Sequence, residues 1–208
     1  DALAAEITAR TGRRVETAAL DVTDADAVPA VFARFAESFG SIDRVVVNAG
    51  IGKGAALGTG RADANRATAM TNFVGALAQT EAALEIFRRQ DRGHLVLVSS
   101  MSALRGMRRA MTTYAATKAG VAALAEGLRS ERIPGVDVSV VYPGYIRSEM
   151  NAHVQQRTRF MVDTRTGVRS MVAAIEKRRA TAYVPAWPWV PIGVLMRVLP
   201  LSVVRKLT

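Results

Sequence analysis

The sequence predicts an α/β fold, a doubly wound parallel sheet of the Rossmann-like kind. Short apolar runs rich in β-branched residues alternate with longer segments whose apolar residues recur every three or four positions. The first pattern is typical of buried strands and the second of amphipathic helices. Such alternation favours parallel strands joined by helices that cover both faces of one sheet. The chain has 208 residues, of which 50% are hydrophobic, and this is enough for one substantial core.

The first fifty residues predict two helices and two strands. Gly12 and Gly40 are suited to end helices, because glycine readily adopts the left-handed backbone found at a helix C-terminus. Thr23 or Asp24 can cap the second helix through a side-chain oxygen. The expected order is a helix at 1–11, a strand at 14–22, a helix that contains Val28 and ends near Gly40, and a strand at 42–47.

The alternation continues from there to residue 185. The expected order is a helix at 64–89, a strand at 94–99, a helix at 112–129, a strand at 136–142, a mostly helical region at 147–179 and a last strand at 181–185. Ligands of parallel sheets bind beyond the carboxyl ends of the strands. Four expected strand ends are followed by polar residues or glycines, namely Asp21, residues 48–50, Ser99 with Ser100, and residues 143–148.

Tyr114 and Lys118 lie four residues apart on an expected helix, so both side chains project from one face. A phenol has an ordinary pKa of about 10 and is a poor acid at neutral pH. An ammonium group one turn away favours the phenolate and lowers that pKa. The pair is therefore suited to passing a proton to or from a carbonyl oxygen.

The composition excludes several classes of site and partner. The chain has no cysteine, and His94 and His153 lie far apart, so we expect no metal site. The net charge is +10, but the arginines are scattered and no aromatic residues interleave with basic runs. Nucleic acid is therefore not an expected partner. The chain opens without the basic start and apolar run of a signal peptide, which makes the cytoplasm the expected compartment.

Six short motifs occur in the order, and at nearly the spacing, of one enzyme family. They are Asp21-Val22-Thr23, Asn48-Ala49-Gly50-Ile51, Asn72, Ser99-Ser100, Tyr114-Ala-Ala-Thr-Lys118 and Pro143-Gly144-Tyr-Ile-Arg-Ser148. With these motifs the chain resembles a short-chain dehydrogenase/reductase over about residues 1–185. The resemblance implies a dinucleotide-binding and catalytic domain at 1–185, followed by an apolar tail at 186–208.

The resemblance implies catalytic roles for four side chains. Tyr114 resembles the general acid/base, and Lys118 resembles the lysine that lowers the tyrosine pKa and binds the nicotinamide ribose. Ser100 resembles the serine that orients and polarises the carbonyl group. Asn72 resembles the helix asparagine that anchors a water in the proton relay. Two hydroxyls aimed at a carbonyl oxygen stabilise the charge that develops there during hydride transfer.

The implied cofactor is NAD(P)(H), and these residues do not decide between NAD and NADP. The implied reaction interconverts a ketone and a secondary alcohol, with a non-catalytic binding protein on the same fold as the alternative. The family also implies a homodimer or homotetramer joined through the helices at 64–89 and 112–129. The implied cofactor-binding residues are Asp21, Val22, Asn48, Ala49, Gly50, Tyr114, Lys118, Pro143, Gly144, Ile146 and Ser148.

The chain departs from the family pattern at three places. No T-G-x-x-x-G-x-G stretch, which seats the pyrophosphate on a helix N-terminus, occurs in the sequence. We therefore expect a chain truncated at its N-terminus, without the first strand–helix–strand portion of the fold. Ser100 stands one residue farther from Tyr114 than is usual, so Ser99 and Ser102 remain alternatives. Ser148 replaces the commoner threonine and keeps the hydroxyl.

The tail at 186–208 is apolar and rich in proline and tryptophan. Its prolines and Arg197 argue against a simple membrane-spanning helix, although 187–204 is nearly all apolar. Three interpretations remain, namely packing or a lid over a lipophilic substrate, an interfacial segment on a membrane surface, and a span. The second would make the protein a peripheral membrane protein.

Overall fold

The computed structural model describes residues 2–148 and 160–207. Its sheet has four parallel strands in the order β1-β2-β3-β4, which confirms the predicted α/β class. The strands are β1 (Arg44–Val47), β2 (Gly93–Val98), β3 (Val136–Pro143) and β4 (Thr181–Val184). In the register, Val96 of β2 lies between Val46 of β1 and Ser139 of β3.

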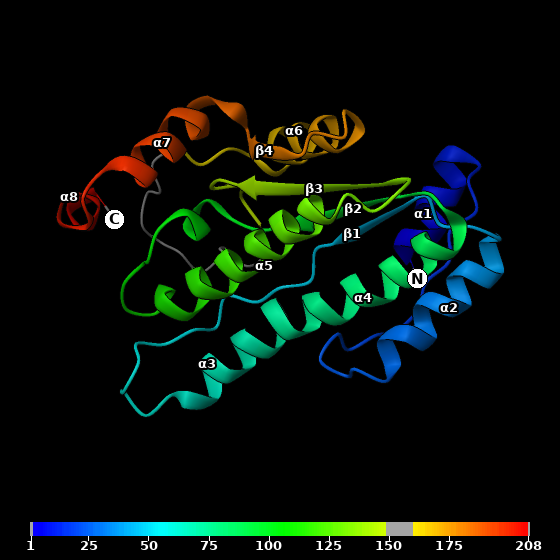
Figure 1. Cartoon of the computed structure of the whole chain (residues 1–208), viewed down its shortest axis with the longest axis horizontal. Coiled ribbons are helices and arrows are strands. Elements are labelled where there is room, and N and C mark those ends of the chain that lie inside the picture. The colour runs from blue at the N-terminus through cyan, green and yellow to red at the C-terminus, as the bar shows by residue number, and fades with distance from the viewer. Residues whose placement is uncertain (1, 149–159, 208) are drawn as a thin grey trace.

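Helices cover both faces of this sheet. In Figure 1, α4 and α5 lie on one face and α6 lies on the other. The helices are α1 (Ala2–Thr11), α2 (Ala27–Phe39), α3 (Ala62–Ala69), α4 (Gly75–Gln90), α5 (Met111–Glu131), α6 (Thr164–Glu176), α7 (Ala186–Val198) and α8 (Leu201–Leu207). A π-helical turn, η1 (Met70–Val74), joins α3 to α4, and a 3₁₀ turn, η2 (Met101–Leu104), follows β2.

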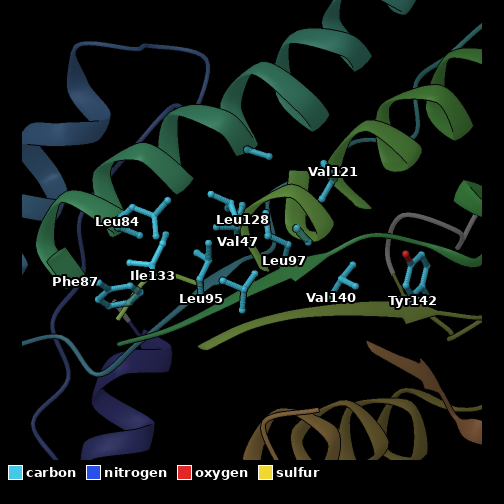
Figure 2. Packing of buried hydrophobic residues seen from close by; sticks show 14 of the residues in the cluster. Val47, Leu84, Phe87, Leu95, Leu97, Val121, Leu128, Ile133, Val140 and Tyr142 are labelled. Atoms are coloured by element: carbon cyan, nitrogen blue, oxygen red, sulfur yellow. The ribbon is translucent and has the colours of Figure 1, made fainter. Parts of the chain in front are cut away.

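The main core lies between the sheet and helices α4 and α5 (Figure 2). Phe87 of α4, Leu95 and Leu97 of β2, and Val140 of β3 are fully buried there. All six residues of β2 are buried, because β2 has a strand on either side and helices on both faces. Burial of each large apolar side chain contributes about 1.5–3 kcal/mol, so this core fixes the sheet edge at which the polar residues gather.

The predicted strand at 14–22 is wrong. Residues 12–21 form no regular structure, although they lie within the described part of the chain. A strand requires a neighbouring strand to share its ladder hydrogen bonds, and the described partner of β1 is β2 alone. The segment is held to α2 instead: Arg14 donates to the Ser38 carbonyl at 3.1 Å, and Arg34 donates to the Thr17 carbonyl at 3.0 Å.

The helix predicted at 64–89 is present but not uniform. It begins at Ala62, ends at Gln90 and contains the π-helical turn η1 between α3 and α4. The turn contains Asn72, whose side chain is fully buried. Because π-turns widen a helix locally and often occur at functional sites, this one marks the position of a predicted catalytic residue.

His94 is a buried histidine near the start of β2, and its ring links β1 to β3 through side-chain hydrogen bonds. His94 of β2 is 0% exposed, accepts a hydrogen bond at Nδ1 from Arg44 Nε at 2.9 Å, and places Nε2 2.8 Å from Ser139 Oγ. Because Nδ1 accepts, the ring is neutral with its proton on Nε2. Burial, reinforced by the Arg44 charge, lowers the pKa of His94 below its ordinary value of 6.5. His153 lies outside the described residues.

Acidification should therefore destabilise the fold through His94. Below about pH 6.5 the unfolded chain takes up a proton on this ring before the folded chain does, so the free energy of unfolding falls with falling pH. Urea unfolding at about pH 7.5 and about pH 5.5 should show a loss, at most about 1.4 kcal/mol, that His94→Gln lacks. Equal losses in both proteins would show that His94 does not carry the effect.

The tail forms two short helices, α7 and α8, separated by Leu199 and Pro200. Figure 1 shows both helices at the end of the molecule toward which the arrow of β3 points, far from α1. Within residues 2–148 and 160–207, no helix is both long enough and apolar enough to cross a membrane. The tail is therefore packed near the carboxyl edge of the sheet, where the candidate site lies.

Candidate active site

The carboxyl ends of neighbouring strands bring the predicted residues to one edge of the sheet. Asn48 follows β1, Ser99 follows β2 and Gly144 follows β3. Ser99 N donates to the Val141 carbonyl at 2.8 Å, and Gly144 N donates to the Val184 carbonyl at 2.9 Å. These bonds continue the ladder beyond the strands, so the residues after β2 and β3 are held in place by backbone.

Ser100 and Tyr114 form a hydrogen-bonded hydroxyl pair at this edge. The Ser100 hydroxyl oxygen accepts hydrogen bonds from Ser102 Oγ at 2.9 Å and from Ser102 N at 3.2 Å. Its own proton is then free to be donated to the phenol oxygen. Of the three serines that the spacing left open, Ser100 is the one paired with Tyr114, whereas Ser99 Oγ donates to the Lys118 carbonyl at 2.7 Å.

The expectation that Lys118 lowers the pKa of Tyr114 is not met in this structure. Burial raises the pKa of the half-buried Tyr114 phenol above its ordinary value, and the hydrogen bond with Ser100 opposes that rise. The two side chains do share one side of α5, as the spacing predicted. The Lys118 ammonium, however, is turned toward the backbone of β2, so the lowering influence on the phenol comes from Ser100.

Lys118 is a buried cation with one carbonyl partner. Its side chain is 5% exposed, and Nζ donates to the Val98 carbonyl at 2.8 Å. Desolvation lowers its pKa from 10.5 to about 8. Within the described part of the chain this carbonyl is the acceptor found for Nζ, although an ammonium has three N–H donors. The lysine therefore retains donor capacity next to the site.

The burial of Lys118 should be visible in the pH dependence of stability. Between about pH 8 and pH 10.5 the unfolded chain keeps a proton that the folded chain has released, so this group adds stability as pH rises. Relative to Lys118→Met, the wild-type free energy of unfolding should therefore increase by about 2–3 kcal/mol across that window. Lys177→Met, at an exposed lysine, is the matched control; a constant difference between wild type and Lys118→Met would contradict the burial.

Asn72 clamps the glycine-rich loop after β1. Its Oδ1 accepts from Ile51 N at 2.7 Å, and its Nδ2 donates to the Ile51 carbonyl at 2.9 Å. A Cβ added at Gly50 would lie 3.3 Å from Asn72 Oδ1 and 3.4 Å from Lys118 Nζ. The absence of a side chain at Gly50 thus keeps the space beside the lysine ammonium open. Ala49 is half-buried and Asn48 is exposed.

Asp21 and Val22 lie apart from the hydroxyl pair. Asp21 Oδ1 accepts from Thr23 N at 2.9 Å and from Thr23 Oγ1 at 2.8 Å, and these bonds lower the pKa of its exposed carboxyl. Val22 packs against Gly75, where an added Cβ would lie 2.8 Å from the Val22 carbonyl oxygen. Gly75 is the first residue of α4 and lies three residues after Asn72. Val22 therefore packs on the start of α4, next to the turn that contains Asn72.

The segment after β3 turns across the edge of the sheet. Pro143 ends the strand, Ile146 forms an isolated parallel bridge with Val162, and the Ile146 side chain packs against Gly167 of α6. Ser148 is exposed. The segment is therefore anchored at Ile146, which is itself a predicted nicotinamide-binding residue, with Pro143 before it and Ser148 after it.

Trp189 of α7 packs directly on this segment and was not predicted. A Cβ added at Gly144 would lie 2.0 Å from indole Cε2, so the indole rests on bare backbone. Trp189 is 5% exposed, and its Nε1 has no hydrogen-bond partner among the described residues. Tyr145 and Phe160 meet its ring edge to face, with centroids 5.4 and 6.5 Å away. The tail thus forms one wall of the site.

Two further residues organise the loops of the site. Ser102, which the sequence left open as an alternative to Ser100, donates to Ser100 instead. The second, Asn65, was not predicted. Asn65 Oδ1 accepts from Ala55 N at 3.0 Å and from Thr113 Oγ1 at 3.1 Å. It joins the loop after β1 to the start of α5, and no motif in the sequence indicated this bridge.

Comparisons with known proteins identify the family. A family model described as short chain dehydrogenase matches residues 1–159. An uncharacterized oxidoreductase of Mycobacterium tuberculosis (strain CDC 1551 / Oshkosh) is 50% identical over 194 residues, which cover 93% of this chain and 76% of that protein. The 3-oxoacyl-[acyl-carrier-protein] reductase MabA of Mycobacterium avium is 33% identical over 138 residues, or 66% of this chain and 54% of that protein.

Solved structures agree with the family match. A short chain dehydrogenase of Burkholderia cenocepacia J2315, in complex with NADP, gives a TM-score of 0.80 at 25% identity over 94% of this chain and 82% of that chain. A short-chain dehydrogenase of Streptomyces avermitilis gives a TM-score of 0.75, also at 25% identity, over 97% of this chain and 79% of that chain. The residues gathered at the sheet edge, the family match and these structural neighbours together show that the chain belongs to the short-chain dehydrogenase family of oxidoreductases.

Proposed function

We propose that this protein is an NAD(P)-dependent oxidoreductase that interconverts a ketone and a secondary alcohol. The observation that carries the proposal is the Ser100–Tyr114 hydroxyl pair, which lies on the carboxyl edge of the sheet one helical turn from the buried ammonium of Lys118. Hydroxyls held in this way are suited to act on a carbonyl oxygen, because they bind it and exchange a proton with it.

The residues present fit a nicotinamide dinucleotide. Gly50 keeps the space beside Lys118 Nζ open, and Lys118 has N–H donors beyond the one used by Val98. A ribose hydroxyl is a suitable acceptor for such a donor. Bound there, the nicotinamide supplies or accepts the hydride, which no side chain can do. The NADP in the Burkholderia cenocepacia structure supports the same class of cofactor.

Tyr114 donates the proton to the oxygen of the ketone, and in the reverse direction it accepts the proton of the alcohol. Ser100 contributes a second hydroxyl aimed at the same oxygen, and Ser102 fixes the orientation of Ser100 by donating to it. Because burial raises the pKa of the Tyr114 phenol, the phenol is held protonated at neutral pH. That state is the one required for carbonyl reduction.

Lys118 and Asn72 are assigned to the part of the site that would hold the cofactor. Lys118 is held by the Val98 carbonyl and is assigned to the cofactor, whose ribose would accept from its remaining N–H donors. Asn72 holds the backbone at Ile51 through two hydrogen bonds and so keeps Gly50 close to the lysine. The remaining cofactor contacts are assigned to three segments, namely Asp21 with Val22 for the adenine, residues 48–50 for the ribose, and Pro143, Gly144, Ile146 and Ser148 for the nicotinamide carboxamide.

The substrate is assigned to the lipophilic class. Tyr145 and Phe160 are 47% and 48% exposed, and both rings pack on Trp189 beside Gly144. Exposed aromatic rings beside a catalytic edge favour the binding of apolar groups. The relative MabA acts on a 3-oxoacyl chain by its name, and this supports an apolar ketone as the substrate class.

Self-association is assigned to η1 and α4 rather than to the tail. Met70, Val74 and Leu77 are 37%, 40% and 36% exposed and share one side of η1 and α4. An apolar stripe that faces water at helical spacing is typical of an interface between helices. A homodimer or homotetramer built on this stripe would leave the carboxyl edge of the sheet accessible.

Turnover with a panel of ketones tests the proposed function. The purified chain is mixed with NADPH or NADH and with methyl ketones and 3-oxoacyl thioesters of increasing chain length, and the absorbance of the reduced nicotinamide is followed. We expect consumption of the cofactor that increases with chain length of the ketone. Binding of the cofactor without consumption for every ketone and every alcohol tested would favour a binding protein instead.

A further inference from the structure

Helix α7 is apolar except for Arg197 in its last turn, and its inner side packs on the candidate site. Trp189 rests on Gly144, and a Cβ added at Gly193 would lie 3.3 Å from Leu104 Cδ1 of η2. At the far end of the helix, Arg105 Nη2 donates to the Leu199 carbonyl at 2.9 Å. These contacts at both ends hold α7 against the protein, so its opposite side has a defined orientation.

The opposite side presents a continuous apolar stripe to water. We call it the outer stripe. Its residues on helix α7 are Val190, Val194, Leu195 and Val198, with exposed fractions of 42%, 57%, 50% and 70%. In the sequence it is flanked by Trp187, whose backbone is not helical, and by Leu201 of α8, with exposed fractions of 78% and 59%. Val190, Val194 and Val198 follow one another at four-residue spacing, which places them on one side of a helix. An apolar helix is normally buried on all sides, so the outer stripe indicates a surface that binds something.

The charges around the stripe are of one sign. Residues 186–208 contain three basic residues, namely Arg197, Arg205 and Lys206, and no acidic residue. Arg197 and Arg205 are exposed and lie four residues before and after Leu201, beside the stripe. The net charge of the whole chain is +10. A basic surface with an apolar centre is complementary to an anionic surface that also has an apolar interior.

We propose that the outer stripe docks on the surface of a membrane that contains anionic lipids. The valines and leucines enter the boundary between headgroups and acyl chains, Trp187 lies at the headgroup level, and Arg197 and Arg205 contact lipid phosphates. The regular part of α7 follows Trp187 and ends at Val198, so it is about 16 Å long, too short for the hydrocarbon layer of about 30 Å. The helix therefore lies in the plane of the membrane.

A second copy of the chain fits this surface less well. A two-fold dimer would place the same patch of both copies together. Such an interface would contain Arg197 and Arg205 of both copies, and residues 186–208 offer no acidic side chain to pair with them. The stripe of Met70, Val74 and Leu77, to which self-association is assigned, lies on another element and leaves α7 free.

Vesicle sedimentation tests the docking, which does not depend on the proposed reaction. The chain is centrifuged with phosphatidylcholine vesicles and with vesicles that contain about one third phosphatidylglycerol. We expect binding to the anionic vesicles that weakens in high salt, because exposed charges are screened. The double variant Val194→Glu/Val198→Glu should lower the partition coefficient by about tenfold or more, because it places two carboxylates in the apolar layer.

The matched control lies on helix α6. Val168 and Val172 are 47% and 50% exposed and also stand four residues apart, so Val168→Glu/Val172→Glu makes the same change of charge outside the stripe. This control should sediment with anionic vesicles nearly as the wild type does. Equal sedimentation of the stripe variant and the control would overturn the proposal.

The two tryptophans provide a second readout. Trp187 is 78% exposed and Trp189 is 5% exposed, and the chain contains no other tryptophan. Anionic vesicles should therefore shift the emission of Trp187 to shorter wavelength and shield it from an aqueous quencher, and Trp187→Phe should abolish both effects. Light scattering tests the alternative, in which a second copy of the chain covers the stripe. A wild-type dimer that Val194→Glu/Val198→Glu dissociates, together with no vesicle binding by the wild type, would assign the stripe to that second copy.

Discussion

Replacing Tyr114 with phenylalanine should lower kcat for ketone reduction by about 10²–10⁴-fold, the usual contribution of a positioned proton donor. The ring and its packing are kept, and the hydroxyl that pairs with Ser100 is lost. Tyr114 is also an implied cofactor-binding residue, so loss of its hydroxyl should raise the dissociation constant of NADPH by about tenfold at most, far less than the fall in kcat. Steady-state turnover and a cofactor titration on the same preparation measure the two quantities.

Tyr183→Phe is the matched control for this substitution. Tyr183 lies in β4 and packs on Tyr142, with ring centroids 5.2 Å apart. It removes one phenolic hydroxyl from the same protein without touching the Ser100–Tyr114 pair, so kcat should stay close to that of the wild type. Full activity of Tyr114→Phe would refute the assigned proton donor, whatever the control shows.

Replacing Gly135 with alanine should destabilise the fold strongly. Gly135 has φ of +71°, and an added Cβ would lie 1.9 Å from the Asp91 carbonyl oxygen. The left-handed backbone costs alanine about 1–2 kcal/mol, and the clash is with backbone, which cannot rotate away. We expect a loss of about 3–5 kcal/mol in the free energy of unfolding, a large share of a typical total of about 5–15 kcal/mol.

Gly127→Ala also replaces a glycine with alanine, but we expect it to raise the free energy of unfolding rather than lower it. Gly127 lies inside α5, and a Cβ there would meet nothing within 4 Å. Alanine is favoured over glycine inside a helix by about 0.5–1 kcal/mol, so this variant should be slightly more stable than the wild type. Denaturant unfolding compares the two variants; similar stabilities would contradict the packing of the turn before β3 against Asp91.

Local patterns predicted most of the strands and the placement of the candidate site. The apolar run before Ser99 became a fully buried strand, because such runs are stable in the middle of a helix-covered sheet. The run before Asn48 also became a strand, but β1 lies at the edge of the described sheet, and of its four residues Val47 alone is buried, so its predicted burial was wrong. Four-residue spacing placed Tyr114 and Lys118 on one side of a helix. Ligands of parallel sheets bind beyond the carboxyl ends of the strands, and this rule predicted that the residues after the strands lie near one another at that edge.

The predictions that failed depended on partners distant in the sequence. The run at 14–22 has the composition of a strand, but a strand exists only where a neighbour shares its hydrogen bonds. The pKa of Tyr114 was expected to follow its spacing from Lys118. It depends instead on burial and on the direction in which the lysine points, toward the Val98 carbonyl.

The position of the tail was open for a similar reason. An apolar segment with prolines and tryptophans is compatible with packing, with a membrane surface and with a lid. The contact between Trp189 and Gly144 shows that one side of α7 packs on the site. Only a glycine allows the indole to approach the backbone so closely, and nothing in the order of residues indicates which tryptophan will use it.

Transfer of deuterium from the cofactor tests whether the chain carries out hydride transfer with Tyr114 as the proton donor. NADPH labelled with deuterium at both hydrogens of the nicotinamide C4 is incubated with the chain and a long-chain methyl ketone, and the alcohol is examined by mass spectrometry. We expect one deuterium on the carbinol carbon, formed by the wild type and by Tyr183→Phe but at a rate lower by about 10²–10⁴-fold with Tyr114→Phe. Alcohol that forms without the label would rule out hydride transfer from the cofactor, and labelled alcohol that forms at the wild-type rate with Tyr114→Phe would rule out Tyr114 as the proton donor.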